Sequence, residues 1–169
     1  ITLVLVLSPA ETLRSAFFWT LGSLSGISWS MNAILVAYAV PATVAAWGLG
    51  RHLDALALGD ETAAAVGTEV ETIKRAAFFL ASLLAAATVS VAGVIGFVGL
   101  VVPHAVRLLW GSAHRRLIPL TFLAGAAGLV ITDAGARALG GAVEIPIGVV
   151  TAFLGVPFFL VLLRRKGGT

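Results

Sequence analysis

The chain has 169 residues, of which 59% are hydrophobic and 11% are charged, and its formal net charge at pH 7 is +3. Soluble domains carry about 25% charged residues because their surface faces water, so this composition excludes an ordinary soluble domain. The absence of cysteine excludes a disulfide framework and a thiolate metal site. The basic residues lie at the ends of apolar runs rather than in a patch suited to nucleic acid.

Residues 1–7 are apolar but too few to cross a membrane core of about 30 Å as a helix. They lack the basic region and the cleavage site of a signal peptide, so we interpret them as the end of a span whose beginning is missing. Residues 8–30 follow as a segment on the outer side. The aromatic residues between Phe17 and Trp29 are typical of a short helix at the membrane interface.

Three later runs are long and apolar enough to cross the membrane as helices. They are residues 31–49, 117–136 and 145–163, and Asp133 is their only charged residue. Asp133 lies near one end of its run, so we predict one complete span for each of the three.

The apolar stretch from residue 76 to residue 110 is too long for one straight span, and glycines interrupt its middle. Basic residues stand immediately before the stretch and at its end. Because basic residues favour the cytoplasmic side, the chain must cross an even number of times between them. We therefore predict two short spans, 76–92 and 94–110, joined by a tight turn near Gly93.

The same tendency orients the whole chain. Nine of the 11 Lys and Arg residues lie at predicted cytoplasmic ends, and only Arg14 and Arg137 lie outside. The tail, 164–169, is therefore expected in the cytoplasm. A lipid-facing backbone must satisfy its own hydrogen bonds, and the alternation of a barrel is missing. We predict an all-α polytopic membrane helix bundle with about five complete spans and one partial span.

Residues 50–75 connect two spans on the predicted cytoplasmic side. Gly59 separates a leucine-containing stretch from an acidic start at Asp60, which favours two short helices with a glycine hinge, the second ending near Gly67. Most helix connections have about 2–8 residues, so a connection of this length is expected to have a function. An amphipathic loop on the membrane surface is the alternative.

Two further features carry alternative interpretations. Asp133 and Arg137 are spaced to pair on one helical face, and an arginine on the outer side, at the start of the predicted loop 137–144, also suits an acidic partner. His104 is either an intramembrane proton relay or, near a helix end, a residue that reaches the interface or caps the helix.

Several long strings of this sequence resemble the FecCD-type permease family, which imports ferric siderophores, haem and cobalamin. They are ALALGDETAAAVG (55–67), GVIGFVGLVVPHAVR (93–107), HRRLIPL (114–120) and EIPIGVVTAFLGVPFFLVLLRR (144–165), with a weaker match at 13–29. They occur in the family's order. Ala113 departs from the family pattern, in which an aspartate commonly precedes the histidine and would cap a helix locally.

The resemblance implies the second half of a ten-helix permease that works as a homodimer or close heterodimer in the bacterial inner membrane. The expected function is import by ATP-driven alternating access, for iron–siderophore complexes or for haem or cobalamin. The implied partners are cytoplasmic ABC ATPase subunits, a periplasmic or lipid-anchored substrate-binding protein, a second permease copy and membrane lipid.

The resemblance also implies roles for individual residues. The implied ATPase-coupling residues are Leu56, Leu58, Gly59, Glu61, Ala64 and Gly67. The implied docking residues for the binding protein are Arg137 and Arg14. Helix breaks and the transport path are predicted at Gly93, Gly96, Gly99, Pro103, His104, Arg107, Pro146, Gly148, Gly155 and Pro157.

The chain has no phosphate loop of the form G-x-x-x-x-G-K-[ST], so we predict that it is not an enzyme and binds no cofactor directly. ATP and Mg²⁺ would be bound by the partner ATPase. The rival interpretations are a secondary, ion-coupled transporter and a membrane fragment that does not transport. Ion-coupled carriers usually place ionisable residues at the middle of the membrane, whereas the charges here lie near span ends.

Overall fold

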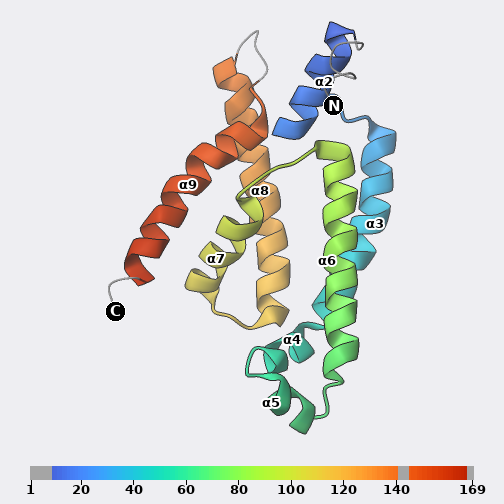
Figure 1. The fold of residues 1–169 in the computed structure, drawn as a ribbon, viewed down its shortest axis with the longest axis vertical. Helices are drawn as coiled ribbons and strands as arrows, with labels where there is room; N and C mark the ends of the chain where they lie inside the picture. The colour runs from blue at the N-terminus through green and yellow to red at the C-terminus, as the bar shows by residue number, and fades with distance from the viewer. Residues whose placement is uncertain (1–8, 141–144, 167–169) are drawn as a thin grey trace.

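The structure is a computed structural model that describes residues 9–140 and 145–166. Every regular element in these two ranges is an α-helix, which confirms the predicted fold class (Figure 1). The helices are α2 (Ala10–Leu21), α3 (Trp29–Gly48), α4 (Gly50–Leu56), α5 (Asp60–Ala65), α6 (Val70–Ala92), α7 (Val98–Trp110), α8 (His114–Gly140) and α9 (Ile147–Lys166). The predicted partial span at 1–7 lies outside the described residues.

Three of the described helices, α3, α6 and α8, are long and apolar enough to cross a membrane. The two remaining predicted spans correspond to shorter apolar helices, α7 and the apolar part of α9. With 13 residues, α7 is about 20 Å long at about 1.5 Å per residue, which is less than the membrane core. It begins at Val98, four residues after the start of the predicted span 94–110. The non-helical link before α7 therefore forms the first part of that predicted span.

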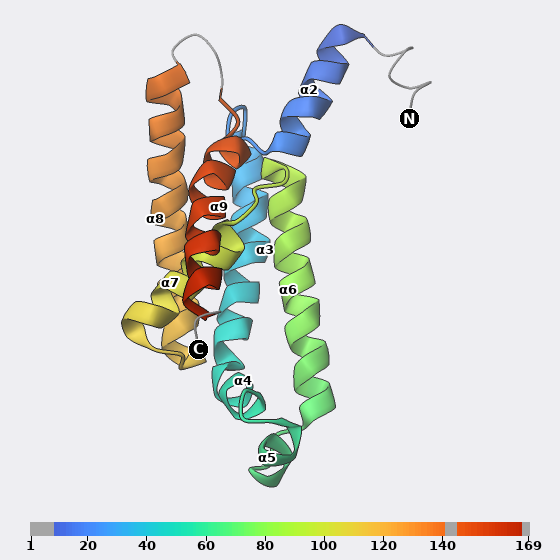
Figure 2. The ribbon, with the colours of Figure 1, turned by 60° about the vertical axis from the view of Figure 1, so that its left-hand side comes forward.

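The helices form two groups that meet along α3 and α8 (Figures 1 and 2). Helices α3 and α6 lie side by side, and α7 and α9 both pack against α8. At one end of the molecule the short helices α4 and α5 connect α3 to α6. At the opposite end α2 reaches the start of α9. The long helices therefore connect two ends that differ in structure.

Most large apolar side chains of the described helices are exposed. Helix α6 contains no buried residue, and Phe78 on it is 74% exposed. The buried hydrophobic residues among those described are few; they are Ala42, Ala63, Val106, Leu117, Ala136 and Ile147. Exposed apolar area of this extent is unfavourable in water, so it fits a surface covered by lipid or by other helices.

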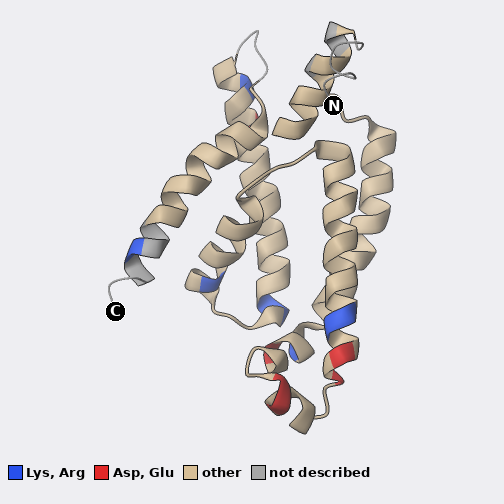
Figure 3. Ribbon diagram, viewed as in Figure 1, with Lys and Arg blue, Asp and Glu red and all other residues tan. Residues whose placement is uncertain are grey.

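Charged residues gather at the end of the molecule that contains α4 and α5, while the middle of the bundle is almost free of them (Figure 3). This arrangement is consistent with the predicted positions of basic residues at span ends. The side of the membrane on which each end lies stays a prediction.

Glycine and serine residues mark several helix ends. Ser28 caps α3, because its Oγ accepts a hydrogen bond from the Met31 N–H at 3.2 Å. Gly93 ends α6 with a φ of +71°, and residues 93–97 then form a link to α7 that is longer than the predicted tight turn. Phe97 precedes α7 with a φ of +65°, and among the described residues it is the one non-glycine with positive φ. This strained conformation explains why α7 starts later than predicted.

Candidate functional site

The connection between α3 and α6 folds into two short helices. Helix α4 follows α3 directly, and Gly59, with a φ of +111°, separates it from α5. Gly67, with a φ of +83°, then leads toward α6. A positive φ is readily adopted only by glycine, so these two residues determine where the helices end. The predicted pair of helices and its hinge are confirmed; we call residues 50–67 the α4–α5 unit.

The predicted coupling residues lie mainly on the outside of the α4–α5 unit. Leu58, Gly59, Glu61, Ala64 and Gly67 are exposed, and Leu56 is half-buried. Leu58 is 74% exposed, and Val66, which the sequence did not single out, is 69% exposed. Apolar side chains among polar ones give a composition suited to contact with another protein, and the role of this surface in ATPase docking stays a prediction.

The α4–α5 unit is tied to its surroundings by buried and polar contacts. Thr68 is buried, its N–H donates to the Ala63 carbonyl at 2.9 Å, and its Oγ1 lies 3.2 Å from Nδ1 of His52 on α4. Lys74 at the start of α6 forms an ion pair with Asp60 on α5. These contacts link α4, α5 and α6, so the unit has a defined shape.

Further polar contacts join the α4–α5 unit and the end of α3 to the start of α8. Oδ1 of Asp54 on α4 accepts the backbone N–H of His114 at 2.8 Å and lies 2.7 Å from the His114 Nδ1. The Trp47 Nε1–H donates to the Arg115 carbonyl at 2.8 Å. Gly50 approaches so closely that an added Cβ would lie 3.0 Å from Cγ of Arg115. We call these five residues the α8 clamp.

The electrostatics of the α8 clamp favour an ionised Asp54. Burial alone would raise the pKa of the Asp54 carboxyl. Hydrogen bonds from the backbone and the ring of His114 lower it, as does the charge of that ring. The net effect is a pKa below the ordinary value. An aspartate at a helix N-terminus is also favoured by the helix dipole. Asp54 therefore caps α8 from another helix, and it takes the place of the local cap missing at Ala113. The sequence did not identify Asp54, although it is the one acidic residue on α4.

At the opposite end of α8, the predicted pair of Asp133 and Arg137 is present. The Nε–H of Arg137 donates to Oδ2 of Asp133 at 2.8 Å, and the Arg137 side chain is 57% exposed. Helix α8 continues through Gly140, so the predicted loop 137–144 begins as helix, and 141–144 lie outside the described residues. Arg14 lies within α2, but the placement of its side chain is outside what the structure describes.

Three glycines allow α2, α6 and α9 to meet near this end. An added Cβ on Gly93 would lie 2.1 Å from the Trp19 carbonyl oxygen, and one on Gly148 would lie 2.0 Å from the Leu21 carbonyl oxygen. At Gly22 it would lie 2.6 Å from the carbonyl oxygen of Val94. We call Gly22, Gly93 and Gly148 the glycine junction. Two of the predicted helix-break residues therefore permit close packing of backbones.

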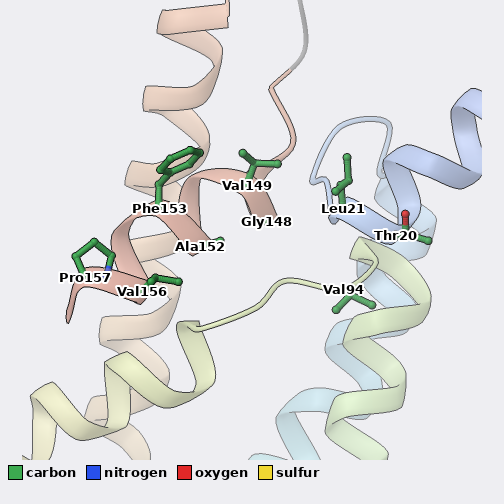
Figure 4. Close-up of a pocket in the computed structure, with 9 residues that line it drawn as sticks. All are labelled: Thr20, Leu21, Val94, Gly148, Val149, Ala152, Phe153, Val156 and Pro157. Carbon is green, nitrogen blue, oxygen red and sulfur yellow. The ribbon is translucent and has the colours of Figure 1, made fainter. Parts of the chain in front are cut away.

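A cavity of about 500 Å³ adjoins the glycine junction (Figure 4). Its lining residues come from α9 on one side and from α2 and the link after α6 on the other; they are Thr20, Leu21, Val94, Gly148, Val149, Ala152, Phe153, Val156 and Pro157. All nine are uncharged. Two predicted path residues, Gly148 and Pro157, are among them.

The other predicted path residues are not brought together at this cavity. Pro103 and Arg107 lie on α7, and Gly99 lies in its first turn, where an added Cβ would meet no other part of the molecule within 4 Å. Gly96 belongs to the link before α7, and Pro146 directly precedes α9.

Gly155 packs so closely on Phe97 that an added Cβ would lie 2.3 Å from the Phe97 Cβ. The rings of His104 and Phe158 meet edge to face with their centroids 6.4 Å apart, so His104 packs between α7 and α9, and its role as a relay or a cap stays a prediction.

Comparison with known proteins places this arrangement in a family. The profile of the FecCD transport family matches residues 1–165. The chain belongs to that family. Relatives include a cobalamin import system permease protein BtuC of Halobacterium salinarum, 42% identical over 98% of this chain and 44% of the relative. The hemin transport system permease protein HmuU of Yersinia pestis is 39% identical, over 95% of this chain and 48% of the relative.

The FecCD-family fold is also found in a solved structure. That structure, described as an inward-facing conformation of a metal-chelate type ABC transporter, has a TM-score of 0.87 and 34% identity, over 97% of this chain and 53% of that chain. The Fe(3+) dicitrate transport system permease protein FecD of Escherichia coli is 39% identical, over 95% of this chain and 51% of the relative. The FecCD-family chain therefore spans about half the length of the relatives it matches.

Proposed function

We propose that this FecCD-family chain forms part of the permease of a binding-protein-dependent ABC importer in the bacterial inner membrane. Its proposed cargo is an iron–siderophore complex, with haem or cobalamin as the other candidates. Family membership and the similarity to permeases named for cobalamin, hemin and ferric dicitrate support this proposal. The proposed partners are cytoplasmic ATPase subunits, a substrate-binding protein and a second permease copy.

The observation that carries the proposal is the connection between the α4–α5 unit and α8. The unit presents Leu58 and Glu61 outward, while Asp54 and Trp47 hold the first turn of α8. Helix α8 has 27 residues and is about 40 Å long at about 1.5 Å per residue. A displacement applied at the exposed surface of the unit would therefore reach the far end of α8.

In the proposed mechanism, ATP binding closes two partner ATPase subunits, and their movement shifts the α4–α5 unit. The α8 clamp passes this shift to α8, and the glycine junction at the other end moves with α9 and α2. The bundle would then alternate between openings to the two sides of the membrane. The chain itself supplies the force-transmitting helices; ATP and Mg²⁺ are bound by the partner.

The far end of α8 is the proposed docking site for the binding protein. Arg137 is more than half exposed and is held by Asp133, so its guanidinium has a fixed position from which to meet an acidic residue. The C-terminal tail would lie in the cytoplasm, together with the α4–α5 unit.

The uncharged lining of the large cavity favours an ATP-driven importer over a proton-coupled carrier. A carrier that couples to protons places an ionisable group beside its substrate. The nine residues that line the cavity of about 500 Å³ carry no ionisable side chain. An external energy source, the ATPase, fits this lining better.

Transport in proteoliposomes tests the proposal. The chain is produced together with the neighbouring reading frames for the ATPase, the binding protein and any further permease helices, and the vesicles receive a radiolabelled ferric siderophore. We expect uptake that requires ATP and the binding protein. Uptake driven by a proton gradient without ATP would instead identify a carrier, and failure to assemble with the ATPase would favour a fragment that does not transport.

A further inference from the structure

A basic hollow lies where α3 turns into α4, against the first turn of α8. It has a volume of about 390 Å³ and is lined by Trp47, Gly48, Arg51, His52 and Arg115. Both arginines are exposed, and neither has an ion-pair partner among the described residues. The nearby carboxylate of Asp54 accepts hydrogen bonds from His114 and forms no ion pair with either arginine. The hollow therefore offers two guanidinium groups to an anion.

An apolar groove begins at the same tryptophan and runs between α3 and α8. Its volume is about 250 Å³, and it is lined by Thr43, Val44, Trp47, Ile118, Pro119, Phe122 and Leu123. Trp47 therefore borders both the basic hollow and the groove. On α3 the other lining residues lie within about one helical turn of Trp47. On α8 they lie within about two turns of Arg115. Both sets are farther from the charged end of the molecule than the hollow is. The groove thus points along the apolar helices, away from the arginines.

We propose that the hollow and the groove together bind one anionic phospholipid. Its phosphate lies between Arg51 and Arg115, because guanidinium groups form paired hydrogen bonds with phosphate oxygens. One acyl chain lies in the groove between Val44 and Leu123. A polar site joined to an apolar groove at the level of an interfacial tryptophan matches a lipid, whereas a free anion would use the hollow alone.

The position of this lipid site gives it a consequence for the fold. Trp47 and Arg115 belong both to the α8 clamp and to the lipid site. A bound lipid would touch α3, α4 and α8 at once, so it would hold the α4–α5 unit against α8. This inference depends on the chain being in a membrane and does not depend on the proposed transport function.

Native mass spectrometry of the detergent-purified chain, with whichever subunits co-purify, tests the proposal. The probes are phosphatidylglycerol and phosphatidylcholine with identical acyl chains. We expect retained phosphatidylglycerol on the unaltered protein and little phosphatidylcholine. Near a membrane each arginine contributes about a fivefold change in affinity, so the Arg51→Gln, Arg115→Gln double variant is expected to bind phosphatidylglycerol about 25-fold more weakly.

Arg116→Gln is the matched control, because Arg116 is exposed in the same turn of α8 and does not line the hollow. It is expected to bind phosphatidylglycerol as the unaltered protein does. If the double variant loses its helical circular dichroism, the two single variants replace it, each with an expected fivefold loss. A dihexanoyl phosphatidylglycerol, which leaves most of the groove empty, is expected to bind more weakly than the long-chain lipid.

Five results would overturn the proposal, the first four of which concern the lipid directly. Those four are equal retention of the two lipids, an equal loss in Arg116→Gln, equal binding of the short-chain lipid, and displacement of the lipid by millimolar inorganic phosphate, which would identify a simple anion site. A protein surface is the remaining possibility. Protection of Arg51→Cys from maleimide by the ATPase subunit, without any preference for phosphatidylglycerol, would identify that surface and would also reject the lipid.

Discussion

Asp54 and His114 stand 60 positions apart in the chain and are joined twice. One carboxylate oxygen of Asp54 lies 2.8 Å from the backbone nitrogen of His114 and 2.7 Å from its ring Nδ1. The contact caps the longest described helix with a residue from the α4–α5 unit. It is therefore the polar contact through which we expect movement of that unit to reach α8.

Replacing Asp54 is expected to loosen the start of α8. Asp54→Ala removes the cap and should lower the free energy of unfolding by about 1–2 kcal/mol, the usual cost of losing such a cap. Asp54→Asn retains an oxygen acceptor for the His114 N–H and should cost less. Thermal unfolding in detergent and amide exchange at residues 114–117 measure the two effects. Equal stability of all three proteins would show that the contact does not support α8.

The same contact predicts a pH dependence. The pKa of Asp54 is lower in the folded chain than its ordinary value of about 3.9, so the unfolded chain takes up the proton first as the pH falls. The stabilisation is fully present above the ordinary pKa and is lost as the pH falls through the folded pKa. Melting temperatures should therefore fall more steeply below about pH 4 for the unaltered protein than for Asp54→Asn. Parallel curves for the two proteins would contradict this origin.

The glycine junction predicts a large difference between two glycine substitutions. Gly148→Ala would place a Cβ 2.0 Å from the carbonyl oxygen of Leu21, so backbones must separate, and we expect a loss of about 2–4 kcal/mol in unfolding free energy. Gly128→Ala is the control, because no atom lies within 4 Å of its added Cβ in the interior of α8. It should be neutral or raise the stability by up to about 1 kcal/mol. Similar effects of both would argue against close packing at the junction.

Arg137 is expected to affect docking far more than stability. Its pair with Asp133 is exposed and spaced i,i+4, so removing it should cost only about 0.3–0.5 kcal/mol. Arg137→Glu should weaken the affinity for the binding protein about tenfold or more, because it places like charges opposite each other. Asp133→Asn, which keeps the arginine, should retain docking. Surface plasmon resonance with the binding protein measures both, and unchanged affinity of Arg137→Glu would refute the docking role.

The parts of the fold that local signals determine could be predicted from the sequence. Gly59 followed by Asp60 indicates a helix break and a new helix start, and the structure has α5 beginning at Asp60. The spacing of Asp133 and Arg137 predicts their ion pair, and Gly93 predicts the end of α6. Each of these features depends on residues within a few positions of one another.

The parts that depend on distant residues could not be predicted. Nothing near Asp54 indicates that it faces the start of α8, because that contact is made by the packing of whole helices. The late start of α7 follows from the positive φ of Phe97, which packs against Gly155 on α9. The basic hollow likewise joins Arg51 and Arg115 from two helices. Sequence patterns identify helices well, but the sites formed between them require their arrangement in space.

Cross-linking at the α4–α5 unit tests the central claim most directly. The chain has no cysteine, so an introduced cysteine is the one thiol that this chain contributes. Leu58 on the unit is 74% exposed, so Leu58→Cys is the probe. Leu139, near the other end of α8, is 84% exposed, so Leu139→Cys is the control. In membranes that contain the assembled transporter, we predict that a short thiol-to-amine cross-linker joins Leu58→Cys to the ATPase subunit and does not join Leu139→Cys. An assembled complex that transports with ATP but cross-links equally at both positions, or only at Leu139→Cys, would contradict the assignment of the α4–α5 unit as the coupling surface.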